Sequence, residues 1–536
     1  MKKNIRFQIL LLWIFLVVLG LNGRSYFPID ETRCVTVAWN MWLNGDYLVP
    51  YLNDVAYSHK PPLLFWLINL GWKVFGVNDW WPRLVPSLFA LASVFITRKI
   101  AGRLWPGQTN ITDNSSLILI SSGLWVVFST ALMFDMLIAF FTVLGAWGML
   151  IAAQDRGIKG WVLLALAIGG GLLAKGPTIL LQLLPLALLA HWWKADNKPN
   201  AKNWYLPLLC SVLGGAAIAL IWAIPAGIHG GSEYQHAIFW GQAADRMVDS
   251  FAHKRPFWWY LVLMPLLFFP WLLWGAFWKG LFKHNSADSG IRFCIAWALP
   301  VFVAFSFISG KQVHYVLPIF PAIALLVAIY TSKSISTSRT LTLPVSIALL
   351  ALGAALFALP LYTHLHQNHF ASWIETIPPW LGLFTILLAG LIYLLPKKSV
   401  TSATSQLAMM TITLVTALMF VIMRAAGDAY DVRLISAKLK QLESQNIPIA
   451  YMGRYPGIFN FLGRLNQSPE NVNGASIEPW FATHPNGRVI VYFNDFNKVD
   501  LNQVEFVQAY KGSAIGIVKR EQWLANKNAR SFQQAK

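Results

Sequence analysis

Charged side chains are scarce in this sequence. Asp, Glu, Lys and Arg make up 12% of the 536 residues, against roughly 25% in soluble proteins, while hydrophobic residues make up 56%. So few charges in a chain of this length exclude an ordinary soluble globular protein. Acids are the scarcer sign, with 23 Asp and Glu against 42 Lys and Arg, so the net charge is +19.

Cysteine and internal repetition are also lacking. Cys210 and Cys294 lie in apolar segments and Cys34 stands alone, which excludes a disulfide framework. The sequence shows no internal repeat, and no ionisable residue stands near the middle of an apolar segment. Secondary transporters are often built from such repeats around polar sites at the membrane midplane, so these absences disfavour a transporter.

Long apolar runs are what the sequence has instead. A hydrocarbon core takes about 20 apolar residues to cross, and thirteen segments approach that length. They predict an all-α, polytopic membrane domain. The first segment has no small-residue cleavage site after it, which favours an uncleaved anchor over a signal peptide. The predicted spans cover residues 7–23, 83–101, 116–133, 136–152, 161–174, 177–193, 204–224, 257–278, 292–308, 315–330, 342–361, 380–396 and 405–423.

Basic residues occupy every second connection between the predicted spans. Lys2, Lys3 and Arg6 precede the first span, and Lys397 and Lys398 follow the twelfth. Because short cytoplasmic connections are enriched in Lys and Arg, this alternation predicts a cytoplasmic N-terminus and, after an odd number of spans, an external C-terminus. The positive net charge is therefore a topology signal and does not indicate nucleic-acid binding.

Two regions outside the spans predict further structure. The first outer loop, 24–82, contains a Trp-rich segment over 31–44 that predicts an interfacial helix, and a second over 63–76 that predicts an interfacial or re-entrant one. After about Arg424 the composition becomes that of a soluble domain, with strand-like runs IPIAYMG, RVIVYF, VEFVQAY and AIGIVK. We therefore predict a membrane domain over 1–424 and a small α/β domain over 425–536.

Three carboxylates fall on the predicted outer side. Asp30 and Glu31 follow the first span in FPIDETR, and Asp135 lies at an outer turn in ALMFDMLIAFF. Asp30 could instead cap the helix that begins at Glu31, and Glu31 could be solvated. On a helix the two would point about 100° apart and need not share a task. An unpaired carboxylate among Met, Phe and Leu costs several kcal/mol, which favours a function for Asp135.

Cationic and aromatic side chains gather on the same predicted side. Each has a structural alternative: Lys175 could extend to the headgroups, Lys254 and Arg255 could contact lipid, and a single histidine often serves structure. Their joint placement indicates a polar site at the outer surface. The set comprises Arg33, Tyr57, His59, Lys60, Lys175, Arg246, His253, Lys254, Arg255, Lys311, His314 and Tyr315.

Carboxylates and cations at an outer membrane surface suit glycosyl transfer from a lipid-linked sugar phosphate. The leaving polyprenyl phosphate gains negative charge, which Lys, Arg and His side chains stabilise. A hydroxyl acceptor needs a carboxylate base within hydrogen-bond reach, whereas an acceptor that is already a phosphate needs none. The lipid tail of the donor needs an apolar groove between helices.

Six stretches make the sequence resemble the GT-C glycosyltransferases, in the branch of the bacterial aminoarabinose transferases (ArnT) and the dolichyl-phosphate-mannose protein mannosyltransferases. They are FPIDETR, YSHKPPLLFW, the segment around Asp135, LLAKGP, HKRPFWWY and KQVHYVLPIFPAIALL. The resemblance implies a GT-C fold with a soluble periplasmic domain in the bacterial inner membrane. It also implies an undecaprenyl-phosphate-linked sugar donor, and lipid A, lipopolysaccharide or another glycan as acceptor.

The resemblance implies roles for single residues as well. Asp30 matches the catalytic carboxylate of the family, with Glu31 beside it, and Asp135 matches a second acidic position. No resident cofactor is implied with certainty; a divalent metal ion held by the three acids and the histidines stays open, and inversion at the anomeric carbon is expected. The positions that resemble the surroundings of the donor phosphate are Arg33, Tyr57, Lys60, Arg246 and Tyr315, and their placement adds Lys175, His253 and Lys311 to the expected substrate-binding set.

The sequence also departs from the family pattern. His59 stands where ArnT-like sequences often carry Glu, and the loop before Arg246 reads GQAAD, without the expected histidine. These differences bear on the sugar and the acceptor more than on the reaction. The alternatives are protein O-mannosyl transfer to Ser or Thr, an O-antigen ligase or polymerase, a transporter of lipid-linked sugars, and a non-catalytic scaffold.

Overall fold

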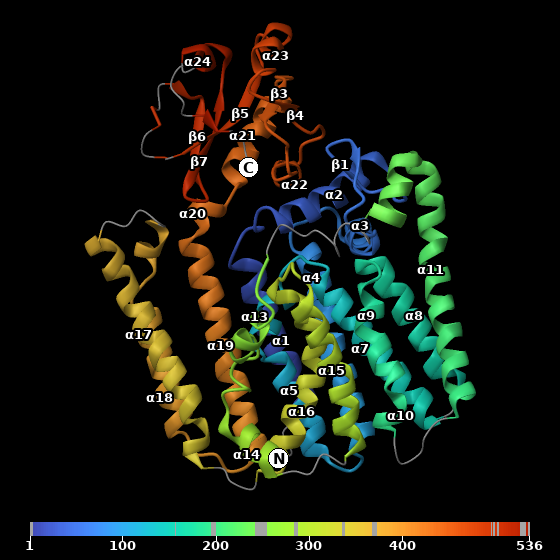
Figure 1. The fold of residues 1–536 in the computed structure, drawn as a ribbon. Helices are drawn as coiled ribbons and strands as arrows, with labels where there is room; N and C mark the ends of the chain where they lie inside the picture. The colour runs from blue at the N-terminus through green and yellow to red at the C-terminus, as the bar shows by residue number, and fades with distance from the viewer. Residues whose placement is uncertain are drawn as a thin grey trace.

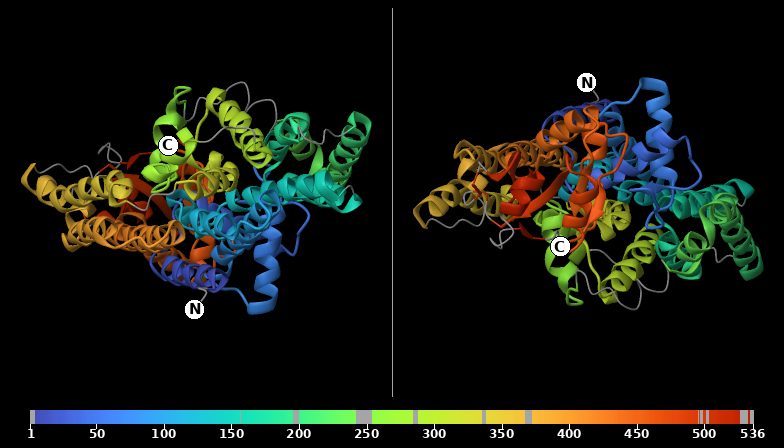
Figure 2. Two further views of the ribbon diagram at one scale, coloured as in Figure 1. Left: turned by 90° about the horizontal axis from the view of Figure 1, so that it is seen from below. Right: turned by 90° about the horizontal axis from the view of Figure 1, so that it is seen from above.

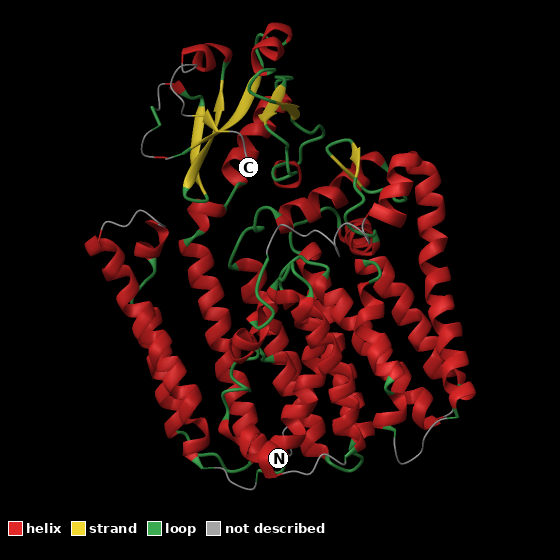
Figure 3. Cartoon of the chain, viewed as in Figure 1, coloured by secondary structure: helices red, strands yellow, loops and turns green. Residues whose placement is uncertain are grey.

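The computed structural model is a bundle of long helices with a small sheet-containing domain at one end (Figure 3). In the described part of the chain, nine helices are long and apolar enough to cross a membrane, or ten if one bent pair counts as a span. The protein is therefore a multi-pass membrane protein. The structure describes residues 4–155, 157–194, 200–241, 254–283, 288–334, 338–366, 372–494, 496, 499–500, 503–525 and 532–533.

The long helices coincide with predicted spans, and their order along the chain sets the shape of the bundle. Viewed from above or below, the bundle is elongated, with the green helix α11 at one end and the gold pair α17 and α18 at the other (Figure 2). The long helices are α1 (Ile5–Asn22), α4 (Trp81–Leu104), α7 (Asp135–Asp155), α8 (Ile158–Lys175), α11 (Ala201–His236), α15 (Ser289–Phe307), the 3₁₀ turn η3 (Val313–Ile319) with α16 (Phe320–Ser332), η4 (Arg339–Thr342) with α17 (Leu343–His366), and α19 (Val400–Ala425).

Four predicted spans are bent, short or broken. Pro185 and Pro265 lie inside two of these helices, where a proline removes a backbone donor and crowds the preceding turn. Every predicted span contains helix, whereas the count of thirteen stays a prediction. The interrupted segments are α5 (Thr109–Ile120) and α6 (Gly123–Ser129), bent by 61°, α9 (Thr178–Leu188) with α10 (Ala190–Trp193), α13 (Trp259–Leu267) with α14 (Gly275–Lys283), and α18 (Trp380–Leu394).

The first loop folds into two helices that lie between the bundle and the sheet (Figure 1). Helix α2 (Asp30–Asn44) ends at Gly45, whose φ of +67° is the left-handed conformation that closes many helices. Helix α3 (Leu63–Phe75) packs against it, with Trp39 edge-on to Trp72 at 6.3 Å. A short hairpin, β1 (Tyr51–Leu52) and β2 (Val55–Ala56), joins the two helices. The two predicted helices of this loop are therefore present.

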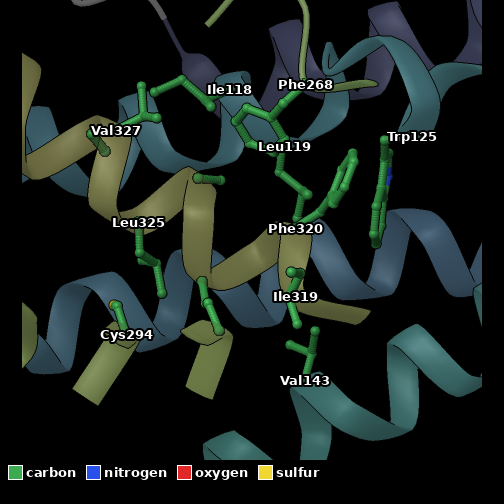
Figure 4. Packing of buried hydrophobic residues seen from close by; sticks show 14 of the residues in the cluster. Ile118, Leu119, Trp125, Val143, Phe268, Cys294, Ile319, Phe320, Leu325 and Val327 are labelled. Carbon is green, nitrogen blue, oxygen red and sulfur yellow. The ribbon is translucent and has the colours of Figure 1, made fainter. Parts of the chain in front are cut away.

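The centre of the bundle is packed with interlocking apolar side chains (Figure 4). Ile118 and Leu119 of α5 lie beside Val327 and Phe320 of α16, and all four are fully buried. Cys294 of α15 is buried in the same cluster, so its role there is packing.

The C-terminal domain is a small α/β unit, as predicted. Its sheet has the strand order β4-β3-β5-β7-β6, with β8 also paired to β5. The four strand-like runs correspond to β3, β5, β6 and β7, while β4 and β8 were not predicted. The predicted domain boundary falls in the last turn of α19 and stays a prediction. The elements are α20 (Gly427–Tyr430), α21 (Arg433–Ser444), β3 (Ile449–Met452), α22 (Asn460–Gly463), β4 (Glu470–Val472), α23 (Ile477–Thr483), β5 (Arg488–Phe493), β6 (Phe506–Tyr510), β7 (Ser513–Val518), α24 (Arg520–Ala525) and β8 (Phe532–Gln533).

Helix α22 docks the C-terminal domain onto the first-loop helices. Phe461 is buried and stacks on Trp72 with ring centroids 5.1 Å apart. The indole N–H of Trp39 donates to the carbonyl of Leu465 at 2.8 Å. Arg464 forms an ion pair with Asp79 at 2.6 Å. The sheet domain thus rests directly on the helix that begins with Asp30.

Replacing Phe461 with Ala is expected to lower the stability of this joint by about 3 kcal/mol, because a buried aromatic side chain leaves a cavity between α2 and α3. Thermal unfolding of the purified protein in detergent measures the change. Leu434→Ala is the matched control, since Leu434 is 70% exposed on α21 and should shift stability by less than about 0.5 kcal/mol. Equal shifts for both variants would contradict the docking role of Phe461.

Candidate functional site

A buried carboxylate with two basic partners lies at the end of the bundle nearest the sheet domain. Asp135 is the first residue of α7, and its side chain is 4% exposed. Its Oδ1 lies 2.5 Å from Nζ of Lys175, and its Oδ2 lies 3.9 Å from Nε2 of His314. The carboxylate therefore organises two nitrogen groups that come from separate parts of the chain.

Three elements bring this cluster together. Helices α7 and α8 are joined by a short turn at their other ends, so the start of α7 and the end of α8 reach the same level (Figure 1). Gly176, with φ +72°, ends α8 directly after Lys175. The turn η3 adds His314 from beside α7. The alternative that Lys175 reaches the headgroups is wrong, because its ammonium group points inward to Asp135.

The polar turn of the first loop adds further predicted residues to this cluster. Nζ of Lys60 lies 5.8 Å from the ring centroid of Phe134, the residue before Asp135. Nζ of Lys175 lies 4.9 Å from the ring centroid of Tyr315. The structure thus brings Lys60 and Tyr315 near the buried carboxylate, and their contact with the donor phosphate stays a prediction.

The neighbouring turn residues are aromatic. Tyr57 is buried, and its ring meets that of His59 at 5.3 Å and that of Phe65 at 6.4 Å. Phe65 in turn packs edge-on against Phe134 at 5.5 Å. This aromatic packing holds the turn 57–60 against the start of α7.

Asp30 is the exposed acid of the site. Its side chain is 66% exposed, and its Oδ1 lies 3.1 Å from Nη2 of Arg33. Helix α2 begins at Asp30 itself, and Ile29 in the capping position makes no side-chain cap bond. The alternative that Asp30 caps the helix is therefore wrong. Asp30 also lies within electrostatic reach of His314, which links it to the buried cluster.

Glu31 lies in a different environment from Asp30. It is 3% exposed and forms a bidentate ion pair with Arg24. It also accepts backbone N–H groups from Phe27 and Leu132, each at 2.7 Å. The alternative that Glu31 is solvated is wrong. The two neighbouring acids point apart, as the helical geometry predicted.

The ion pair keeps Glu31 charged. Burial would raise the pKa of Glu31, but the charge and hydrogen bonds of Arg24, the nearby Arg83 and the Phe27 amide lower it to about 2. A carboxylate with its acceptor sites filled in this way cannot readily serve as a base. These contacts hold the start of α2 against the turn at Leu132, and the catalytic role of Glu31 stays a prediction.

Lys311 also takes a structural place. It is buried, and its ammonium group donates to the carbonyl of Arg255 at 2.8 Å and to that of Ile308 at 2.6 Å. Lys254 and Gly310 form an isolated β-bridge beside it. Lys311 therefore fastens the segment before α13 to the segment after α15, and its contact with substrate stays a prediction. Arg246 and His253 lie outside the described residues.

Some functional neighbours were not predicted. Arg24 falls in the predicted loop after the first span, and Arg83 is the first residue of the predicted second span. In the structure Arg83 is buried, donates to the carbonyls of Leu21 and Arg24, and lies 4.2 Å from the ring centroid of Tyr26. A usable signal was the arginine within the otherwise apolar stretch WPRLVP.

No three His, Cys, Asp or Glu side chains come together as a metal-binding group among the residues that the structure describes. Asp135 faces a lysine and a histidine, and Asp30 faces an arginine. Burial raises the pKa of the Cys34 thiol, which disfavours a reactive thiolate there. The arrangement is a cation-rich site around one buried and one exposed carboxylate, suited to binding an anionic group.

Known proteins share parts of this sequence. The family described as dolichyl-phosphate-mannose-protein mannosyltransferase matches residues 59–228. The chain is 29% identical to the undecaprenyl phosphate-alpha-4-amino-4-deoxy-L-arabinose arabinosyl transferase of Enterobacter sp. (strain 638) over 348 residues. That match covers 63% of this chain and 62% of the relative, which is less than two thirds of its length.

Known structures share the whole fold. The crystal structure of ArnT from Cupriavidus metallidurans in the apo state aligns with a TM-score of 0.76 at 19% identity, covering 96% of this chain and 97% of that one. The same protein bound to undecaprenyl phosphate aligns with a TM-score of 0.76 at 19% identity, covering 97% and 98%. The predicted ArnT-like GT-C fold is therefore confirmed.

Proposed function

We propose that this chain is a glycosyltransferase that moves a sugar from an undecaprenyl phosphate donor to lipid A. The observation that carries the proposal is the Asp135–Lys175–His314 cluster, with Lys60 and Tyr315 beside it, close to the exposed Asp30. The similarity to arabinosyl transferases and the fold shared with an undecaprenyl-phosphate-bound ArnT support the donor.

The buried cluster suits the leaving group. As the bond between the anomeric carbon and the donor phosphate breaks, its electron pair leaves with the polyprenyl phosphate, whose oxygens gain charge. Lys60 and Lys175 would stabilise that charge by charge-assisted hydrogen bonds. Asp135 would hold the Lys175 ammonium group in place before the donor arrives, which preorganises the site.

The exposed carboxylate suits the acceptor. The acceptor oxygen forms the new bond to the anomeric carbon from the face opposite the leaving phosphate, which inverts that carbon. If the acceptor is a hydroxyl, its proton passes to Asp30. If it is a phosphate of lipid A, no proton needs to move, and Asp30 with Arg33 orients the acceptor.

The same proposal sets the orientation in the bacterial inner membrane. The predicted cytoplasmic side includes the last turn of α4, where Arg103 pairs with Asp155 at 2.7 Å. This pair and the cluster around Asp135 lie at opposite ends of α7. The positive-inside rule then supports a cytoplasmic N-terminus, with the site and the sheet domain in the periplasm.

Mass spectrometry of lipid A and lipopolysaccharide tests the function. Cells deleted for the chain should lose a sugar mass increment that wild type restores. Complementation with Asp30→Asn should restore about a tenth of the sugar increment or less, because a charge-assisted hydrogen bond to the acceptor, about 1.5–3 kcal/mol, is lost. A lost increment that Asp30→Asn restores in full would contradict the role of Asp30 and would support a scaffold.

The family match to protein mannosyltransferases favours a second candidate, transfer to Ser or Thr of a protein. An unchanged lipopolysaccharide profile, with a sugar lost from the glycoproteome, would support it over lipid A. A transporter has less support, because the charged cluster lies at one end of α7 and not at its middle.

A further inference from the structure

A tight turn of the sheet domain reaches the membrane domain beside Asp30. Strands β6 and β7 pair Tyr510 with Ser513, which leaves a two-residue turn of Lys511 and Gly512. Both have positive φ, +51° and +76°, as in the turns that join antiparallel strands most tightly. The backbone N–H of Lys511 donates to the carbonyl of Ala429 in α20 at 2.7 Å. The turn is thus fastened to the segment that follows the last membrane helix (Figure 1).

A second contact fastens that segment to the start of α2. The ring of Tyr430 stacks on that of Phe27, with centroids 5.2 Å apart and planes at 20°. Phe27 lies three residues before Asp30 in the chain. Lys511 therefore lies within electrostatic reach of Asp30. Burial lowers the pKa of Lys511, and the charge of Asp30 offsets part of that shift.

Two described cations lie near Asp30. Asp30 already has Arg33 as its direct partner, at 3.1 Å. Among the described residues Lys511 is in no ion pair, and its ammonium group lies 5.3 Å from the ring centroid of Tyr510. Among the side chains that the structure describes, Arg33 and Lys511 place two positive charges beside the one exposed carboxylate of Asp30. An exposed cation of this kind suits an oxyanion.

We propose that Lys511 binds a phosphate group of the acceptor lipid next to Asp30, so that the C-terminal domain supplies part of the acceptor site. This inference rests on the proposed function. The donor also carries a phosphate, but Lys60 and Lys175 lie with the buried Asp135, whereas Lys511 belongs to the soluble domain. Because the donor phosphate is assigned to Lys60 and Lys175, the acceptor is the source that the separate placement of Lys511 favours.

The test separates charge from turn geometry. Lys511→Asn removes the charge with a residue that tolerates positive φ, and Lys511→Arg keeps the charge. Lys519→Asn is the matched control, because Lys519 is an exposed lysine just beyond the other end of β7. The full-length proteins in detergent are given bisphosphorylated lipid A and the undecaprenyl-linked sugar, and kcat and KM are measured for each substrate.

The expected result is an acceptor KM about tenfold higher for Lys511→Asn, from loss of one charge-assisted hydrogen bond. The donor KM should be unchanged, and Lys511→Arg and Lys519→Asn should resemble wild type. An unchanged acceptor KM, a raised donor KM instead, or an equal effect of Lys519→Asn would overturn the proposal.

Binding without turnover keeps the two proposals distinguishable. Retention of the wild-type protein and of Lys511→Asn on vesicles containing bisphosphorylated lipid A is compared with that on vesicles whose lipid A has been dephosphorylated. Weaker retention of the variant only when phosphate is present supports the Lys511 site even if no sugar is transferred. Equal retention of both proteins overturns it, even if the wild type is an active transferase.

Discussion

Replacing Asp135 with Asn is expected to lower kcat/KM by roughly 100- to 1,000-fold, the cost of removing one preorganised electrostatic group from an active site. The buried carboxylate is the direct partner of Lys175, and His314 lies 3.9 Å away on its other oxygen. Without it, the ammonium group of Lys175 loses the contact that points it inward. The donor phosphate then meets a lysine that must reorganise during the reaction.

A double-mutant cycle checks this explanation. Asp135→Asn, Lys175→Met and the double variant are compared in the sugar-transfer assay. If the two residues act as a unit, the double variant should be little worse than either single one. Asp155→Asn is the control, since Asp155 ends the same helix in an exposed pair with Arg103. Multiplied effects of the two single changes would show that Asp135 does not act through Lys175.

The second large effect is expected in stability. Glu31→Gln should destabilise the protein by about 3–5 kcal/mol, because it leaves the buried Arg24 guanidinium without its counter-charge. Thermal unfolding in detergent at pH 7 measures the loss. The double variant Arg24→Met with Glu31→Gln should recover part of it. Glu521→Gln, on the exposed start of α24, should change stability by less than about 0.5 kcal/mol.

The pH dependence of that loss follows from the pKa of Glu31. The folded pKa of about 2 lies below the value of about 4.5 for a free glutamate, so the ion pair stabilises fully above pH 4.5. Its contribution falls as the pH drops through the folded pKa. The difference between wild type and Glu31→Gln should therefore narrow from pH 7 to pH 3. A difference that stays constant or widens would contradict the charged pair.

Parts of the fold were readable because they depend on local composition. Apolar length predicted the helices, and the alternation of basic connections predicted which ends share a side. Pro185 and Pro265 interrupt predicted spans, and apolarity alone cannot show whether such a segment still crosses the membrane. The four strand-like runs of the sheet domain were found, but the three-residue β4 and two-residue β8 carry too little pattern to be recognised.

The site was readable where a residue was anomalous by itself. Asp135 stood out as an acid in an apolar run, and Lys60 and Tyr315 lie near it. Glu31 and Lys311 looked equally suited to substrate, yet their burial and hydrogen-bond partners are set by tertiary packing. Lys511 carried no signal, because its place beside Asp30 depends on how a hairpin late in the chain meets α20.

The contact between Trp39 and Leu465 has a consequence for biosynthesis. The two residues are 426 positions apart, so at about 5–20 residues per second a ribosome needs roughly 20–85 seconds to make the second after the first. During that interval α2 is in place without the domain that rests on it. Asp30, which emerges early, gains its neighbour Lys511 only when the last part of the chain has been made. A nascent chain therefore has no completed site while its later helices are still being inserted.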